Sequence, residues 1–390
     1  MEKNVGHSTV ALVRCESYEG DEVYRALKRG IELLGGLDRF VRSGERILLK
    51  PNLLAAEPPE KAVTTHPALL EAGVRLLGEA GVTCAYGDSP GRETPGHAAR
   101  GCGIAAAAER CGIEMADFIT GKPLVVQPVE GLETQVESSY PIARGVHNAD
   151  GLINLAKAKS HQLTRLTLAV KNLYGCIPGP RKALYHVQYP NVHKFSEMLC
   201  EMVRGLPVRL HVLDAVLAME GNGPRSGDPL HMGLLLISTD PVALDATFCR
   251  LVGVDPEIVP SNPAGAVMGL GRYAEDEVEV VGESLAACAH PAFKMIRRPV
   301  ADNTSYAHYN WIKKLVLARP VIDAKACIHC GQCVAVCPVP DKALRFDRGR
   351  SEPPVYHYER CIRCFCCHEM CPERAIHTRR PLLGRLLGLA

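Results

Sequence analysis

Near its carboxyl end the sequence reads Cys327-Ile-His-Cys330-Gly-Gln-Cys333-Val-Ala-Val-Cys337-Pro338. The same C-x2-C-x2-C-x3-C-P pattern returns as Cys361-Ile-Arg-Cys364-Phe-Cys-Cys367-His-Glu-Met-Cys371-Pro372. Cysteine thiolates are soft ligands, and the short spacing lets one loop wrap around several iron atoms. The duplicated pattern is typical of a domain that binds two [4Fe–4S] clusters, in which the fourth cysteine of each run serves the other cluster.

The spacing divides these cysteines into two sets of ligands. Cluster I is assigned to Cys327, Cys330, Cys333 and Cys371, and cluster II to Cys361, Cys364, Cys367 and Cys337. A pair of zinc sites is the weaker alternative, because zinc sites use two separate CxxC pairs and not this interlocked arrangement. Cys366 falls outside the spacing, and we expect a packed thiol there.

Bulk composition narrows the class of protein. The 390 residues provide for more than one domain, and the net charge of +2 and 5% aromatic residues argue against a nucleic-acid partner. The seventeen cysteines lack the pairing typical of a small secreted scaffold. No secretory signal and no apolar run of membrane-spanning length is recognised, so we expect a cytoplasmic protein.

The N-terminal part alternates between strands and helices. Short apolar runs at Thr9–Cys15, Arg46–Lys50 and Gly81–Tyr86 predict strands, and helical spacing follows Asp21 and Pro67. This order predicts an α/β domain with a parallel sheet. Ligands bind at the carboxyl ends of such strands, which here carry Lys50, Asn52, Asp88 and Ser89.

Further along the chain the pattern is less regular. A strand at Gly151–Leu155 leads into the polar run 157–161, Leu163–Leu173 has helical spacing, and 177–186 is predicted to be a loop. Asp240 with Pro241 is the expected start of another helix. The predicted organisation is an α/β domain that could comprise two lobes (1–285), a connecting segment (286–320), a small α+β two-cluster domain (321–378) and a basic leucine-rich tail (379–390).

Cations and imidazoles are dense on the predicted loops at the strand ends. Such a group would bind a carboxylate, a phosphate or an anionic cofactor, and could pass protons near neutral pH. For Lys157 and Lys182 a solvated basic surface is an equal alternative. The candidate catalytic residues are Lys171, His161 and His186. The candidate binding residues are Lys50, Asn52, Asp88, Ser89, Lys159, Asn172, Arg181 and Asp245.

Several of these motifs resemble known families. The cysteine repeat resembles the bacterial two-cluster ferredoxins. Lys50-Pro51-Asn52, Gly87-Asp88-Ser89-Pro90-Gly91, the run from Asn154 to His161, Leu168 to Gly175, and Asp240 to Asp245 together resemble the DUF362 family. That resemblance implies iron–sulfur binding and a redox setting.

A more remote resemblance is to the nickel-pincer lactate racemases. The order of Lys50, His161, Lys171 and His186 is similar to the histidines and cofactor-anchoring lysine of that family. The chain departs from the family where Gly87-Asp88-Ser89-Pro90 replaces a Gly-x-His-Arg motif. The resemblance implies a shared fold, and would add a further cofactor in the α/β domain if the chemistry were shared.

Three functional hypotheses follow. The leading one is an iron–sulfur oxidoreductase that relays electrons from a redox partner protein to a small anionic substrate or cofactor. The second is a non-catalytic electron carrier or maturation adapter, and the third is a metal-cofactor isomerase or hydride-transfer enzyme. The tail either docks on its own protein, which we favour, or makes a peripheral membrane contact.

Overall fold

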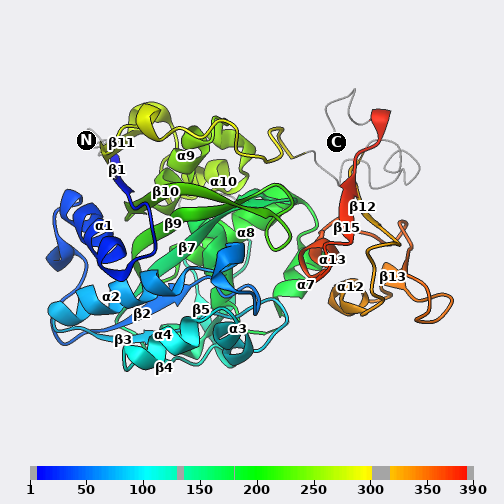
Figure 1. Cartoon of the computed structure of the whole chain (residues 1–390), viewed down its shortest axis with the longest axis horizontal. Helices are drawn as coiled ribbons and strands as arrows, with labels where there is room; N and C mark the ends of the chain where they lie inside the picture. The colour runs from blue at the N-terminus through cyan, green and yellow to red at the C-terminus, as the bar shows by residue number, and fades with distance from the viewer. Residues whose placement is uncertain (1–6, 130–135, 180, 301–316, 384–390) are drawn as a thin grey trace.

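The computed structural model describes residues 7–129, 136–179, 181–300 and 317–383. A large α/β part precedes a small cysteine-rich part, which lies against one end of it (Figure 1). Residues 301–316 of the predicted connecting segment, and residues 384–390 of the predicted tail, lie outside the described residues. Within the described residues, no helix has the length and apolar character needed to cross a membrane.

The α/β part is built on a nine-stranded sheet with the order β11-β1-β10-β9-β7-β2-β3-β4, and β8 pairs with β7 beside this path. The strands β9, β7, β2, β3 and β4 are mutually parallel, whereas β10 is antiparallel to both β9 and β1. The α/β class is therefore confirmed, with a mixed and mostly parallel sheet. The strand bounds are β1 Ser8–Arg14, β2 Arg46–Pro51, β3 Thr83–Tyr86, β4 Glu114–Met115, β7 Gly151–His161, β8 Arg165–Thr167, β9 Val208–Glu220, β10 Asp228–Ser238 and β11 Val278–Gly282.

Helices cover both faces of the sheet, because alternate strand residues are apolar on opposite sides. Leu49 packs with the helices on one face, while its neighbour Leu48 packs with those on the other. The first face carries α1 Gly20–Leu33, α2 Pro67–Glu79, α3 Pro95–Gly101 and α4 Ile104–Arg110. The second carries α6 Ala169–Asn172, α8 Val192–Arg204, α9 Pro241–Leu251 and α10 Ser261–Val267. Among the described residues, the other strands and α-helices of this part are β5 Gly121–Val125, β6 Ser139–Ala143, α5 Arg144–His147 and α7 Arg181–Gln188.

The small part consists of two short antiparallel strand pairs and two short helices. Its core contains three cysteines of the repeat together with Leu344, Ala375 and Ile376. A core this small stabilises a domain poorly by itself. Here the cysteines occupy much of the space that apolar side chains would otherwise fill. The bounds are β12 Arg319–Ile322, α12 Gln332–Val336, β13 Leu344–Arg345, β14 Val355–Tyr356, α13 Cys366–Glu369 and β15 Ile376–Arg379.

Three local predictions are wrong. The polar run 157–161 is no loop: β7 continues to His161, where it pairs with β8 and β9, and its polar side chains are buried and paired. The expected helix Leu163–Leu173 is the strand β8 followed by the single turn α6. The expected loop 177–186 includes the helix α7, whose Lys182 faces inward, so the solvated alternative fails for both Lys157 and Lys182.

The helix α9 begins where the sequence predicts. The Asp240 carboxylate accepts hydrogen bonds from Val242 N at 2.8 Å and Ala243 N at 2.9 Å. Its other oxygen accepts from Ser8 Oγ at 2.6 Å and Arg272 N at 2.9 Å. One side chain therefore caps a helix and also joins β1 to the loop after α10.

Replacing Asp240 with alanine should lower the free energy of unfolding by about 2 kcal/mol, the upper end for a helix cap, because four donors lose their acceptor. The matched control is Asp255→Ala, which removes one exposed cap bond to Glu257 N and should cost about 0.5 kcal/mol. Urea unfolding measures both variants. Equal losses would contradict the joining role of Asp240.

Candidate functional site

A partly open cavity of about 120 Å³ lies where the carboxyl ends of β2, β3 and β7 meet the small part. This volume suits a few water molecules or a small ligand. Polar side chains of the α/β part form most of its wall, and Val336, Cys366, Glu369 and Met370 of the cysteine-rich part complete it. The α/β part contributes Asn52, Asp88, Ser89, Lys159, His161, Thr167, Lys171, Asn172, Tyr174, Lys182 and His186.

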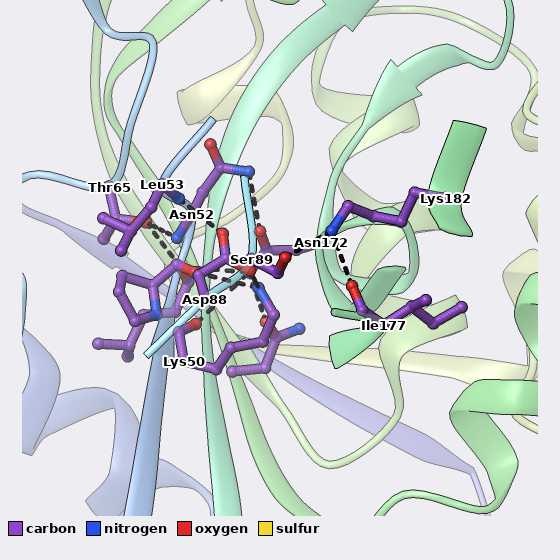
Figure 2. Close-up of polar contacts among 12 residues, drawn as sticks. Lys50, Asn52, Leu53, Thr65, Asp88, Ser89, Asn172, Ile177 and Lys182 are labelled. Atoms are coloured by element: carbon purple, nitrogen blue, oxygen red, sulfur yellow. Dashed lines mark hydrogen bonds and ion pairs between the residues drawn. The ribbon is translucent and has the colours of Figure 1, made fainter. Parts of the chain in front are cut away.

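A buried ion pair supports one side of the cavity. Lys50 Nζ lies 2.8 Å from Asp88 Oδ1, and both side chains are buried. Asp88 Oδ2 also accepts a hydrogen bond from Leu53 N at 2.8 Å, which connects the end of β2 to the loop after β3 (Figure 2). Gly175 passes so close that a Cβ atom there would lie 1.8 Å from Asp88 Oδ1. Lys50 thus orients Asp88 and does not itself line the cavity.

Side-chain amides extend the polar network from the end of β2 across β7 to α6. Lys159 Nζ donates to Asn52 Oδ1 at 3.0 Å and to Val63 O at 2.7 Å. Asn52 Nδ2 donates to Asn172 Oδ1 at 2.9 Å, and Asn172 Nδ2 donates to Asn154 Oδ1 at 2.7 Å. Burial and the neighbouring charge of Lys157 lower the pKa of Lys159 to about 7. Lys159 can therefore gain or lose a proton near neutral pH.

Lys182 lies on α7 at the opposite wall. Its ammonium donates to Ser89 Oγ and to Ile177 O, both at 2.7 Å (Figure 2). Burial lowers the pKa of Lys182 to about 7, although Asp88 acts in the opposite direction. The cavity thus holds a second amine that titrates near neutral pH.

Lys171 is the amine that the protein leaves without an anion. Its Nζ lies 4.9 Å from the ring centroid of Tyr174 and 5.6 Å from that of Phe195. Among the described residues we find no hydrogen bond or ion pair to this group, although the charge of Glu369 acts on it. Burial lowers the pKa of Lys171. An ammonium held over two aromatic rings at a cavity wall is suited to bind an anionic ligand.

His161 connects the two parts of the chain. Its Nδ1 accepts hydrogen bonds from Leu163 N at 3.0 Å and Thr164 N at 3.3 Å, so Nδ1 carries no proton. The proton of the neutral ring is therefore on Nε2, which lies 3.1 Å from Glu369 Oε1 on α13. Burial lowers the pKa of His161 despite this carboxylate, in agreement with the neutral tautomer.

Three other predicted residues have different surroundings. The His186 ring stacks on Phe195 with centroids 4.6 Å apart, and burial lowers its pKa to about 3, so it lines the cavity as a neutral ring. Arg181 is exposed and lies outside the cavity wall, because α7 turns it toward solvent. Asp245 accepts from Ala169 N at 2.8 Å and Val170 N at 3.3 Å, so it holds the start of α6 and does not face the cavity.

The cysteine repeat forms two further cavities. One is lined by Cys327, Cys330, Cys333 and Cys371, and the other by Cys337, Cys361, Cys364 and Cys367. These are the two sets that the spacing predicts as ligands, so the donors fit the expected groups. Cys366 belongs to neither set: it is buried and lines the ligand cavity instead.

Glu369, Cys366, Met370 and Tyr174 also line this cavity, although the sequence does not predict them there. Three of them lie inside the cysteine repeat. The spacing of the repeat identifies the cluster ligands, but it does not indicate which residues between them contact another domain. The one signal was a carboxylate placed between Cys367 and Cys371. Nothing in the local sequence indicates that this stretch faces His161.

The geometry defines a class: an α/β protein with a polar ligand cavity closed by a cysteine-rich iron–sulfur domain. A family model described as "Domain of unknown function (DUF362)" matches residues 47–250, and one described as "4Fe-4S dicluster domain" matches residues 319–372. The chain belongs to the DUF362 family and carries a 4Fe–4S ferredoxin domain. Both family predictions are thereby confirmed, and the domain indicates iron–sulfur binding and electron transfer.

Relatives agree with this assignment. "Thylakoid-associated protein sll1697" of Synechocystis sp. is 34% identical over 269 residues, 69% of this chain and 82% of that protein. A "Ferredoxin" of Pyrobaculum islandicum is 41% identical over 58 residues, 15% of this chain and 50% of the ferredoxin.

Two solved structures show weaker similarity. The lactate racemase apoprotein from Thermoanaerobacterium thermosaccharolyticum is 12% identical with a TM-score of 0.38, covering 62% of this chain and 56% of that one. A Thermotoga maritima protein is 11% identical with a TM-score of 0.35, covering 66% and 61%.

Gly175→Ala should lower the free energy of unfolding by about 1–3 kcal/mol, because the new methyl group displaces the buried Asp88 carboxylate from Lys50. The matched control is Gly78→Ala, on the exposed side of α2 where nothing lies within 4 Å. That control should stabilise the protein by about 0.4–1 kcal/mol. Denaturant unfolding distinguishes the two, and a neutral Gly175→Ala would show that the ion pair tolerates displacement.

Proposed function

We propose that the protein is an iron–sulfur oxidoreductase that exchanges electrons between a redox partner protein and a small anionic ligand bound in the cavity. The observation that carries this proposal is the position of Lys171. Its ammonium faces a cavity whose wall is completed by Cys366 and Glu369 of the ferredoxin domain. A binding site for an anion thus lies directly beside the segment that holds cluster ligands.

The two cysteine sets are proposed to hold two [4Fe–4S] clusters, as the spacing predicts. Each set lines a cavity of its own, which supports the assignment of all the ligands. When bound, such clusters supply one-electron transfer at low potential. The remaining chemistry belongs to side chains of the chain itself.

The side chains of the cavity can bind the ligand and move protons. Lys171 offers the charge that attracts an anion, and the amides of Asn52 and Asn172 offer polar groups that orient it. Lys159 and Lys182, with pKa values of about 7, can donate protons to a ligand that gains electrons. The volume of about 120 Å³ favours a small organic or inorganic anion over a nucleotide.

The two alternatives make different use of these residues. A racemase-like reaction needs imidazoles with a free nitrogen, but both His161 nitrogens have close neighbours and His186 is stacked on Phe195. A non-catalytic carrier or adapter would need only the exposed side of the ferredoxin domain, where Cys330 is accessible. It would leave Lys171, which has no ion pair among the described residues, without a role, and we therefore favour a ligand-binding enzyme.

The cytoplasm is the proposed location, because its reducing conditions keep thiolate ligands available. The alternative is a position at a membrane surface, in line with the printed name of the Synechocystis relative. The predicted tail contact falls mainly on residues outside the described ranges, so it stays a prediction.

Anaerobically reconstituted protein should contain about eight irons, since each [4Fe–4S] cluster holds four. Lys171→Met should keep this iron content but weaken binding of sulfate or acetate by about ten- to hundredfold, the value of a hydrogen bond to a charged group. Iron analysis and calorimetry measure the two quantities. The control is Lys122→Met, an exposed lysine outside the cavity. Unchanged anion binding in Lys171→Met would favour the carrier alternative.

Anion binding should also weaken as the pH rises from 6 to 8. Lys159 and Lys182 are protonated and positive below a pKa of about 7, and lose that charge above it. The affinity should fall by up to about tenfold per pH unit for each linked proton. Sulfate and acetate do not titrate in this range, so calorimetry at several pH values isolates the protein groups. Lys182→Met should reduce the slope; a slope identical to the wild type would exclude Lys182.

A further inference from the structure

We propose that the clusters held by the two cysteine sets have different electron-transfer partners. The cluster that Cys337, Cys361, Cys364 and Cys367 would hold exchanges electrons with a ligand in the cavity, and the cluster that Cys327, Cys330, Cys333 and Cys371 would hold exchanges them with the partner protein. This inference rests on the proposed function and adds to it the order in which the two clusters carry electrons. Neither the spacing of the repeat nor the family distinguishes the two sets.

The first observation concerns the cavity wall. Cys366 lies in the sequence between Cys364 and Cys367, and its thiol lines the ligand cavity. Val336, which precedes Cys337, lines the same wall. Chain segments that carry three ligands of one set therefore border directly on the cavity. In the other set, Cys371 borders this wall through Met370 and through Glu369, which is equally close in sequence to Cys367.

The second observation is the packing of α7. Val187 packs against the cluster of apolar residues that contains Cys337 and Cys361. The same helix carries Lys182 and His186 into the ligand cavity. One short helix thus contacts both the ligand cavity and this cysteine set. In Figure 1, α7 and α13 lie together at the junction of the two parts.

The third observation is the exposure of the other set. Cys330 is exposed, and the adjacent Ile328 keeps 60% of its surface accessible. The cysteines of the set that contains Cys337 are all buried or half-buried. An accessible edge with an apolar side chain is suited to contact a one-electron carrier protein, because tunnelling requires close approach of the two redox groups. Arg92 of the α/β part also reaches this set, donating to Gln332 O at 3.1 Å.

The transfer balances one electron at a time. A reduced carrier protein would lose one electron to the cluster at the set that contains Cys330. That electron would pass to the cluster at the set that contains Cys337, and then to a ligand in the cavity, which is thereby reduced. A closed-shell ligand takes two electrons in successive transfers, with protons supplied by Lys159 and Lys182.

The test is an anaerobic redox titration of the reconstituted full-length protein, followed by electron paramagnetic resonance. Removing a positive charge beside a cluster disfavours its reduced, more negative state and lowers its potential. Lys171→Met should therefore lower the potential of the cluster held by Cys337, Cys361, Cys364 and Cys367 and leave the other in place. The matched control is Arg92→Met, which should affect the other cluster, by a smaller amount because Arg92 is exposed. Cys361→Ser and Cys330→Ser identify which signal belongs to which set.

This order of transfer is overturned if Lys171→Met shifts the reduction potential of the cluster held by the Cys330 set, shifts both potentials equally, or shifts neither. Protein that binds no clusters would instead overturn the proposed function. A second measurement on the wild type uses a dysprosium chelate in solution, which speeds spin relaxation of accessible clusters. The cluster of Cys330 should respond more strongly, and an equal or reversed response would also overturn the order.

Discussion

The contact between His161 and Glu369 is the constraint on which the cavity depends. His161 ends the central strand β7, and backbone N–H groups fix its Nδ1 as an acceptor, so Nε2 points at a carboxylate from the ferredoxin domain 3.1 Å away. Glu369 is mostly buried, and a buried carboxylate is costly without a polar partner. Although burial acts against it, His161 and the nearby Lys171 lower the pKa of Glu369 to about 2. Docking of the two parts therefore places this carboxylate beside His161 and near Lys171.

The same arrangement explains the uneven charge balance of the cavity. Lys50 is matched by Asp88, while Lys159 and Lys182 are held by amide, hydroxyl and carbonyl oxygens. Within the part of the chain that the structure describes, the neighbours of the Lys171 ammonium are two aromatic rings and the more distant charge of Glu369. Buried amines of this kind cost stability, and such local costs concentrate at functional sites. The imbalance is the physical reason to expect an anion there.

The sequence predicted much of this, for identifiable reasons. Periodicity located the strands around Leu48 and Ile153 and the helix that Asp240 caps, because these elements have apolar runs or a local cap. It failed at 157–161, where polar residues that resemble a loop are buried between neighbouring strands by mutual pairing. It also misplaced Arg181 and Asp245, since residue type alone does not reveal which way α7 faces or that Asp245 holds the start of α6.

The sequence by itself determined the cysteine sets, since ligand spacing is a local property of the chain, and it determined the α/β class and the candidates Lys159, His161 and Lys171. Only the tertiary structure decided that Cys366 and Glu369 face those residues, because the contact joins segments about two hundred positions apart and no local pattern encodes their approach. The repeat therefore indicates that electrons are carried. The docking of the two parts decides which residues of the repeat line the ligand cavity, and it leaves Cys330 exposed.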